Sequence, residues 1–189
     1  MLKDLILTNR SYRRFYQNHK ISIEELKDLV ELARLSASGR NLQPLKYFLS
    51  ADEETNQKVF SSLAWAGYLK DWDGPEEGEK PSGYIIILGD TRLTKNYFCD
   101  HGIAAQSILL GAVEKQLGGC IFASIQREKL KQLLNIKNHF EVLLVIALGK
   151  PKEKVVIEEV KNGDIKYYRD EKQVHHVPKR NLDELIISG

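Results

Sequence analysis

The sequence contains little cysteine and no long apolar run. Its two cysteines, Cys99 and Cys120, do not have the spacing of a metal site. The longest uninterrupted apolar run, 142–148, has seven residues, whereas a helix needs about 20 to cross a bilayer. The first ten residues are too short and too interrupted for a secretory signal. We therefore expect a cytoplasmic protein that does not enter a membrane.

Neither sign of charge is in large excess. The 28 lysines and arginines and the 26 acids leave a formal net charge of +2, which disfavours generalised binding to nucleic acid. Residues 1–20 nevertheless hold five lysines and arginines against one acid, and 71–80 holds five acids against one base. Glycines and a proline exclude regular structure from 71–80. We interpret 71–80 as an exposed loop, either a solvated connector or a mobile flap over a site.

The common catalytic motifs are also absent. The sequence has no Gly-x-Ser-x-Gly, no His-Glu-x-x-His, no Walker-type loop and no Gly-x-Gly-x-x-Gly after a strand. Cys120 falls within an apparently buried strand, where cysteine behaves as a small apolar side chain rather than a nucleophile. His175 and His176 are adjacent, so in an extended chain they point to opposite faces and do not share a metal. We expect these two histidines in a polar loop.

Local patterns predict mixed helices and strands. Ser22 and Glu25 form a capping box, and the apolar spacing that follows predicts a helix to about Leu35. A helix at 100–117 is apolar on nearly every side and should be buried, whereas 127–134 is predicted to be a surface helix. Strands are predicted at 45–50, 84–88, 120–123 and 142–148.

The last forty residues begin with a hairpin signal. Asn162 and Gly163 lie between two strand-like segments, and Asn-Gly strongly favours a hairpin turn, so we expect a β-hairpin near 153–172. A polar cap at Asn181 predicts a short helix after it. Without strict βα alternation, the order of elements favours an α+β fold in one domain, 1–189, over a doubly wound sheet.

Two basic constellations stand near the two ends of the chain. Arginines and a serine at 10–15, and a lysine and an arginine at 178–180, are suited to binding a phosphate monoester, because guanidinium groups bond phosphate oxygens in pairs. The alternative is an ordinary solvated basic face. Between them, 36–44 carries hydroxyl and amide groups directly after a helix. Those groups could form hydrogen bonds with the edge of a heterocycle, or they could only cap the helix.

Taken together, the motifs resemble those of the FMN-dependent nitroreductase-like flavoproteins. The resemblance rests on 10–15, on the helix from Ser22 and on 33–44. It continues through 100–117 with Gly118 and Gly119, the strand ending at Pro151, and 178–180. Each motif is weak alone, but their order covers nearly the whole chain.

The resemblance implies a three-layer α/β/α nitroreductase-like fold with a central, mostly antiparallel sheet. It also implies a homodimer with FMN between the subunits. By this resemblance, the residues that look like ligands of the phosphate and the pyrimidine edge are Arg10, Ser11 and Arg13, with Lys179 and Arg180. The residues that reach the flavin ring, in part from the partner subunit, would be Ser38, Arg40, Asn41 and Gln43. The backbone from Ile121 to Ser124 would lie against the flavin centre, with an amide near Ala123 or Ser124 donating to N5.

The resemblance also implies the chemistry. NAD(P)H would pass a hydride to flavin N5, and a nitroaromatic, quinone or other conjugated small molecule would then accept the electrons in a ping-pong cycle. The cofactor would carry this chemistry, which is consistent with the absence of a catalytic side-chain motif. Two alternatives remain open: a flavin enzyme dedicated to one metabolite, by ene reduction or dehydrogenation, and a flavin-binding protein without turnover.

Overall fold

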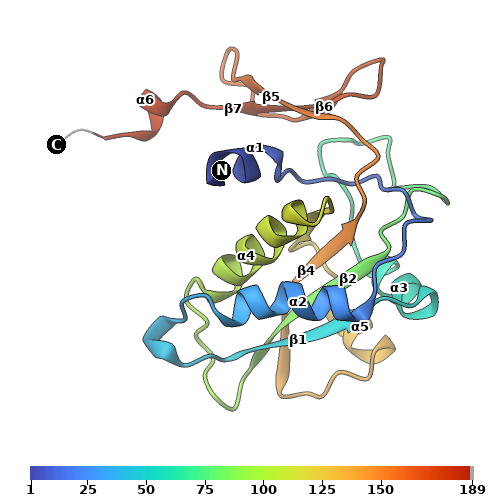
Figure 1. The fold of residues 1–189 in the computed structure, drawn as a ribbon, viewed down its shortest axis with the longest axis vertical. Coiled ribbons are helices and arrows are strands. Elements are labelled where there is room, and N and C mark those ends of the chain that lie inside the picture. The colour runs from blue at the N-terminus through green and yellow to red at the C-terminus, as the bar shows by residue number, and fades with distance from the viewer. Residues whose placement is uncertain (188–189) are drawn as a thin grey trace.

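A four-stranded antiparallel sheet forms the centre of the structure, a computed structural model that describes residues 1–187 (Figure 1). The strand order is β1-β2-β4-β3. The strands are β1 (Leu45–Ser50), β2 (Gly83–Asp90), β3 (Gly118–Phe122) and β4 (Phe140–Gly149). The four predicted strands are therefore confirmed, and three of the four are longer than the sequence indicated.

Helices cover both faces of this sheet. Helices α2 (Ile23–Arg34) and α4 (Asp100–Glu114) lie on one face, and α3 (Glu53–Phe60) and α5 (Arg127–Leu133) lie on the other. Helices α1 (Leu2–Thr8) and α6 (Leu182–Leu185) lie outside these layers (Figure 1). The predicted helices at 100–117 and 127–134 and after Asn181 are confirmed. So is α2, which begins with the predicted capping box: the Ser22 hydroxyl accepts from the Glu25 amide at 3.1 Å.

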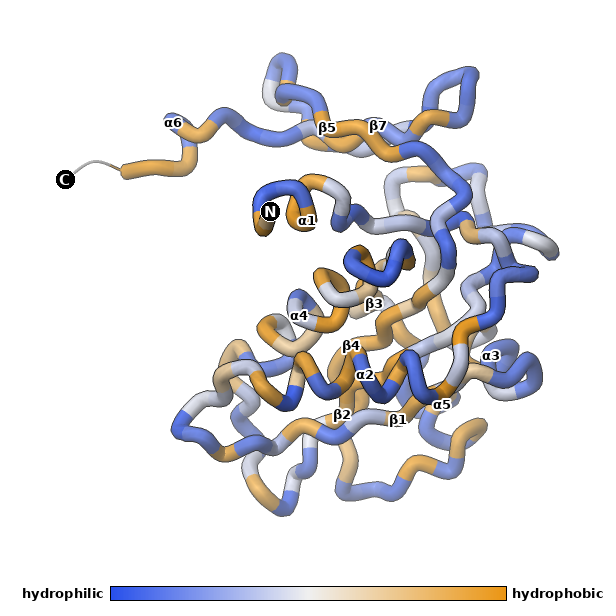
Figure 2. Tube along the Cα trace, viewed as in Figure 1, coloured by the Kyte–Doolittle hydropathy of each residue, from blue (hydrophilic) through white to orange (hydrophobic). Residues whose placement is uncertain are grey.

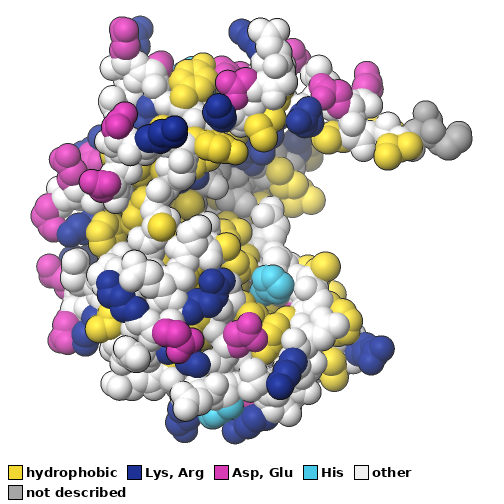
Figure 3. All heavy atoms as spheres, turned by 180° about the vertical axis from the view of Figure 1, so that it is seen from behind, with side chains coloured by type: hydrophobic (Ala, Val, Ile, Leu, Met, Phe, Trp, Pro, Cys, Tyr) yellow, Lys and Arg dark blue, Asp and Glu magenta, His cyan; other side chains and the backbone are white. Residues whose placement is uncertain are grey.

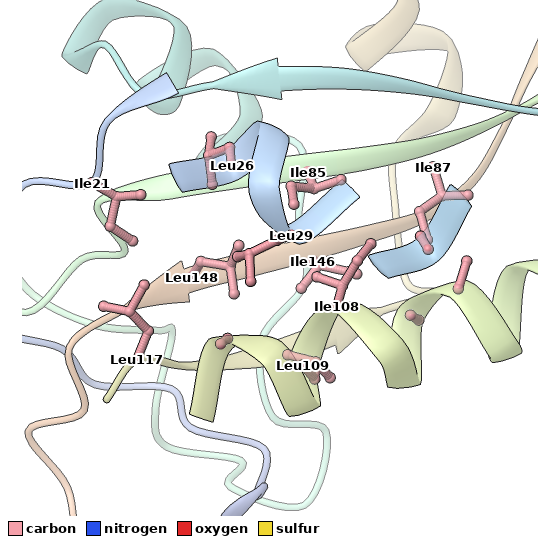
Figure 4. Close-up of a cluster of buried hydrophobic side chains, with 14 residues drawn as sticks. Ile21, Leu26, Leu29, Ile85, Ile87, Ile108, Leu109, Leu117, Ile146 and Leu148 are labelled. Atoms are coloured by element: carbon pink, nitrogen blue, oxygen red, sulfur yellow. The ribbon is translucent and has the colours of Figure 1, made fainter. Parts of the chain in front are cut away.

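The alternation of side chains along β2 and β4 produces two cores. Ile85, Ile87 and Ile146 pack against α2 and α4 on one face (Figure 4). Ile86 and Val145 point the other way and pack against Val59 of α3 and Leu130 of α5, because successive residues of a strand face opposite sides. The predicted three-layer α/β/α fold is thus confirmed. The tube coloured by hydropathy is apolar along these inner strands (Figure 2).

A second, smaller sheet follows Pro151. It contains β5 (Val155–Glu159), β6 (Tyr168–Arg169) and β7 (His175–Lys179) in the order β5-β7-β6. β7 is parallel to β5 and antiparallel to β6. In Figure 1 this sheet lies beyond α1, at the end of the molecule away from α2.

The predicted hairpin near 153–172 is wrong in its pairing. The turn forms, with the Asp164 amide donating to the Lys161 carbonyl at 3.0 Å and with positive φ at Asn162 and Gly163. However, β5 and β6 both pair with β7, which lies between them. The turn signal is local, and it could not show that a later strand would insert.

The prediction of a polar loop at His175 and His176 is also wrong. Both residues lie in β7, and they do point to opposite sides: His175 is 1% exposed, whereas His176 contacts Glu158 and Asp170 at 3.1 and 3.3 Å. Short polar strands such as HHVPK lack the apolar alternation from which strands are recognised. Cys120, by contrast, is buried as predicted, and burial raises the pKa of its thiol.

The acidic segment 71–80 is attached to the start of the chain. Glu79 accepts from Arg14 at 2.5 and 2.7 Å and lies 2.9 Å from the Lys152 amine. The Gln17 side chain accepts from the Gly78 and Lys80 amides at 2.7 and 3.0 Å. These bonds hold the end of the segment on the body of the protein, rather than leaving it in solvent or as a flap.

Among residues 1–187, no helix combines the length and the apolar character that a membrane crossing requires.

The attachment of Glu79 predicts a pH dependence of stability. Hydrogen bonds from Arg14 lower the Glu79 pKa from 4.5 to about 2. Because its folded pKa is depressed, Glu79 stabilises the fold above pH 4.5, and this stabilisation is lost as the pH falls towards 2. Glu79→Gln should therefore lower the free energy of unfolding at pH 7 and reduce its dependence on pH below 4.5.

Urea unfolding between pH 2 and pH 7 measures this effect. Glu24→Gln is the matched control, because the Glu24 side chain is 74% exposed on α2 and its loss should change little. An unchanged pH dependence in Glu79→Gln would contradict the assignment.

Candidate functional site

A cavity of about 320 Å³ lies where the start of the chain, β3, α4 and the small sheet meet. Its volume is within the range of small-ligand sites, about 300–1,000 Å³. Its walls contain three cations, Arg10, Arg13 and Lys179, and no acid. The lining residues are Asn9, Arg10, Ser11, Arg13, Gln106, Leu109, Gly119, Ile121, Tyr167, His175, Val177 and Lys179. The structure therefore brings the two basic constellations from opposite ends of the chain to one site.

Glycines in β3 allow the start of the chain to lie across this strand. Ser11 forms a parallel bridge with Gly119, and the Tyr12 amide donates to the Gly119 carbonyl at 3.0 Å. A Cβ on Gly118 would lie 2.5 Å from the Tyr12 ring, and one on Gly119 would lie 2.5 Å from the Ala147 carbonyl oxygen. Both contacts are too close for a side chain, so glycine is required at 118 for the approach of the first residues and at 119 for the packing of β3 beside β4.

Arg13 is the most informative residue of the cavity. It is only 9% exposed, yet its guanidinium forms no ion pair within residues 1–187. Nη1 lies 3.2 Å from the Ser11 carbonyl and 3.2 Å from His175 Nε2, and the Tyr167 ring lies 4.7 Å from the guanidinium carbon. Two of these partners are uncharged acceptors, and the third is the face of an aromatic ring. A buried charge is costly unless it is paired, so this arrangement favours an anion in the cavity.

The neighbouring Arg14 has a different role. Its guanidinium is paired with Glu79, so its charge is already neutralised at the acidic segment. The sequence presents Arg13 and Arg14 as equivalent neighbours. In the structure their side chains separate, and Arg13 alone of this pair lines the cavity.

The other predicted phosphate ligands divide between the cavity and the surface. Arg10 lies on the wall, donating from Nη2 to the Ile6 carbonyl at 2.6 Å, while its buried Nε has no partner within the described chain. Lys179 lies on the wall at the end of β7. Arg180 points elsewhere and pairs with Glu184 at 3.2 Å. Of the late basic pair, Lys179 is thus the residue at the cavity.

The predicted flavin-facing backbone begins at the same cavity. Ile121 lies on the wall with its side chain 40% exposed. Ala123 and Ser124 follow β3, are exposed, and do not line the cavity. Their carbonyls accept from Arg127 at 3.2 Å and from the Ala64 amide at 3.1 Å, which fixes the backbone of this segment.

The remaining predicted residues lie at a different place. Ser38 and Gln43 line a second cavity, of about 440 Å³, between α2, β1 and the start of α4. Arg40 and Asn41 are exposed beside it. Within one chain, the structure does not bring 38–43 to the cavity that contains Arg13.

The 38–43 loop is held in an unusual conformation by Asp100. Arg40, Asn41 and Gln43 have φ values of 53°, 55° and 50°, a region that non-glycine residues rarely occupy. Asp100, 4% exposed, accepts from the Ser38 hydroxyl at 2.6 Å and from the Gly39 amide at 2.8 Å. The Ser38 hydroxyl oxygen in turn accepts from the Gln43 amide at 2.9 Å.

Sequence reasoning missed several residues of the two sites. Asp100 was recognised only as the start of a helix, and Tyr167 and His175 were assigned to a hairpin and a loop. Asn9 and Gln106, 3.5 Å apart at the first cavity, carried no motif. An acid at the first position of an apolar helix is a signal for Asp100 that the sequence contains, because a carboxylate there can accept from backbone amides at the start of the helix.

We predict that Asp100→Asn loosens the 38–43 loop. The amide nitrogen of asparagine cannot accept, so one of the two bonds to Ser38 and Gly39 is lost; a bond to a charged group contributes about 1.5–3 kcal/mol. Hydrogen exchange of the Gly39 and Gln43 amides should become about tenfold faster or more.

Amide exchange followed by NMR measures this effect. Asp52→Asn is the control, because Asp52 accepts from the Thr55 amide at 2.8 Å at the start of α3, and its loss should leave 38–43 unchanged. Equal exchange in Asp100→Asn and the unmodified protein would show that Asp100 does not hold the loop.

Comparison with known proteins gives a consistent assignment. Residues 6–150 match the model of the nitroreductase family. A Bacillus subtilis protein named as an NAD(P)H nitroreductase, MhqN, is 26% identical over 180 residues, covering 78% of this chain and 87% of the relative.

Solved structures agree in fold. A nitroreductase family protein from Streptococcus pneumoniae TIGR4 covers 100% of both chains with a TM-score of 0.71 at 17% identity. A protein from Clostridium difficile R20291, described as an FMN-dependent nitroreductase, has a TM-score of 0.64 at 20% identity, covering 84% of this chain and 90% of its own. The sequence match over more than half of the chain shows that this protein belongs to the nitroreductase family and is an oxidoreductase of that family.

Proposed function

We propose that the protein binds FMN in the cavity lined by Arg10, Arg13 and Lys179 and transfers electrons from NAD(P)H to a nitroaromatic, a quinone or another conjugated acceptor. The observation that carries the proposal is the buried Arg13 guanidinium, which forms no ion pair among residues 1–187. The name of the Bacillus relative and the description of the Clostridium structure support it.

The residues present fit a flavin mononucleotide. Three cations and no acid on the wall suit a phosphate dianion. The N–H groups at Arg10 Nε and His175 Nδ1 are buried donors without a partner among residues 1–187, and a ligand could accept from them. Leu109, Ile121 and Val177 supply apolar surface to the same cavity, which suits a ligand with an anionic end and an aromatic ring.

The chain would bind and orient the cofactor. Ser11, Arg13 and Lys179 would hold the phosphate, and Arg10 would place positive charge near the pyrimidine edge. The backbone at Ala123 and Ser124, anchored by Arg127 and Ala64, would face the central ring. Bound FMN would supply two-electron transfer, with a hydride from NAD(P)H accepted at N5. Fixed charge and fixed amides stabilise developing negative charge without reorganisation.

We also propose that the active form is a homodimer. Large apolar side chains are exposed on α1, on α4, on Ile121 and on the C-terminal segment that extends away from the body: Leu2, Ile6, Leu7, Ile103, Ile121, Leu182, Leu185 and Ile186. Helix α1 contains no buried residue, and a helix of seven residues is not stable without packing.

The hollow between the small sheet and the body displays apolar side chains (Figure 3). A second copy would cover such a surface. It would also allow the 38–43 loop of that copy to approach the cavity that contains Arg13. This arrangement accounts for the location of the predicted ring-facing residues outside the cavity of their own chain.

The cofactor proposal predicts a yellow protein that retains FMN. Arg13→Ala should weaken FMN affinity by at least about tenfold, because a charge-assisted bond of about 1.5–3 kcal/mol is removed, and should leave riboflavin affinity nearly unchanged. Arg14→Ala is the matched control: its guanidinium pairs with Glu79, so the ratio of FMN to riboflavin affinity should not change.

Titration of flavin-free protein by fluorescence quenching measures both affinities. Steady-state oxidation of NADH and NADPH with a quinone then tests turnover. Equal affinity for FMN and riboflavin in the unmodified protein, or a protein that cannot be reconstituted with FMN, would contradict the proposal.

If the protein is a homodimer, its sedimentation coefficient should be that of a particle with the mass of two chains. Leu7→Asp, on the apolar surface of α1, should shift the equilibrium to monomer and reduce FMN retention. Leu93→Asp, at an exposed leucine in the turn after β2, should remain dimeric. A monomeric unmodified protein that binds FMN fully would contradict this prediction.

A further inference from the structure

The small sheet supplies the cavity with two side chains that contact Arg13. His175 Nε2 lies 3.2 Å from Arg13 Nη1. The Tyr167 ring lies 4.7 Å from the Arg13 guanidinium carbon, and its centroid is 5.2 Å from that of His175. Both residues follow the part of the chain that matches the family model, 6–150. The position of the Arg13 guanidinium is therefore set partly by a segment outside that match.

The hydrogen bond between Arg13 and His175 defines the state of the imidazole. A guanidinium has donors only, so His175 Nε2 must accept, and the ring proton is on Nδ1. Burial and the charges of Arg13, Arg169 and His176 lower the pKa of His175 to about 4. A neutral imidazole is therefore the expected form at neutral pH, and it leaves the charge of Arg13 available for an anion.

The surroundings of His175 hold it in one place. It is 1% exposed, and its amide donates to the Lys154 carbonyl at 2.9 Å. Glu153, whose side chain is 1% exposed, accepts from the Arg13 backbone amide and from Arg169 at 3.1 Å. Glu153 is thus engaged by a backbone amide and by a different arginine, and it does not pair with the Arg13 guanidinium. A carboxylate at the position of His175 would neutralise Arg13, whereas an imidazole orients it without doing so.

We infer that His175 is a positioning residue of the proposed cofactor site: its Nε2 orients the Arg13 guanidinium toward the phosphate of FMN. This inference rests on the proposed function. His175 acts through Arg13, so its removal should affect the phosphate end of the ligand and leave the ring end unchanged. His175 lines the cavity, and its buried Nδ1 has no partner in the described chain.

The test compares FMN with riboflavin, which lacks the phosphate, on the flavin-free full-length protein. His175→Leu should lower FMN affinity by about tenfold, as expected for a lost bond to a charged group, and change riboflavin affinity less than about twofold. His175→Gln should retain most of the FMN preference, because its side-chain oxygen can reach the position of Nε2. His176→Gln, on the opposite side of β7, is the control and should leave the preference unchanged.

A second pair of variants applies if His175→Leu does not fold. The side chain of asparagine is shorter than that of glutamine, so its amide group reaches the position of His175 Nδ1 and not that of Nε2. His175→Asn should therefore lose the FMN preference that His175→Gln retains. Equal preferences in these two variants would overturn the inference, and thermal unfolding of both variants checks that the small sheet is intact.

The results separate this inference from the proposed function. An unchanged FMN preference in His175→Leu, with loss of the preference in Arg13→Ala, would overturn the role of His175 and leave the cofactor site standing. An unmodified protein that does not prefer FMN to riboflavin would overturn the proposed function itself.

Discussion

The burial of the Arg13 guanidinium without an acid is the interaction on which the site depends. Two other arginines near it are neutralised: Arg14 pairs with Glu79, and Arg169 pairs with Glu153. Among residues 1–187, the contacts of the Arg13 guanidinium are two uncharged acceptors and an aromatic ring. Because an unpaired buried charge costs several kcal/mol, its retention on the wall of a cavity indicates a function that requires an anion.

The fold produces this arrangement through two unrelated parts of the chain. Glycines in β3 let the first residues lie across the central sheet, which places Ser11 and Arg13 at its edge. The small sheet then covers that edge and contributes Tyr167, His175 and Lys179. The family match, 6–150, contains the four-stranded sheet and helices α2 to α5. The small sheet follows this match and completes the wall of the cavity.

Sequence patterns predicted the framework well, because its signals are local and strong. The capping box at Ser22, the apolar helix at 100–117 and the β-rich runs are each recognised from residues within the element itself. The separation of Arg13 from Arg14 could not be predicted, because it depends on Glu79, more than sixty residues away. The insertion of β7 between β5 and β6 and the contact of Asp100 with the 38–43 loop are long-range in the same way.

The most direct test of the account is a crystal structure of the protein grown with FMN. We expect the phosphate in the cavity lined by Ser11 and Lys179, with an oxygen within hydrogen-bond distance of the Arg13 guanidinium. A phosphate bound elsewhere, with Arg13 still free of any anion, would contradict it.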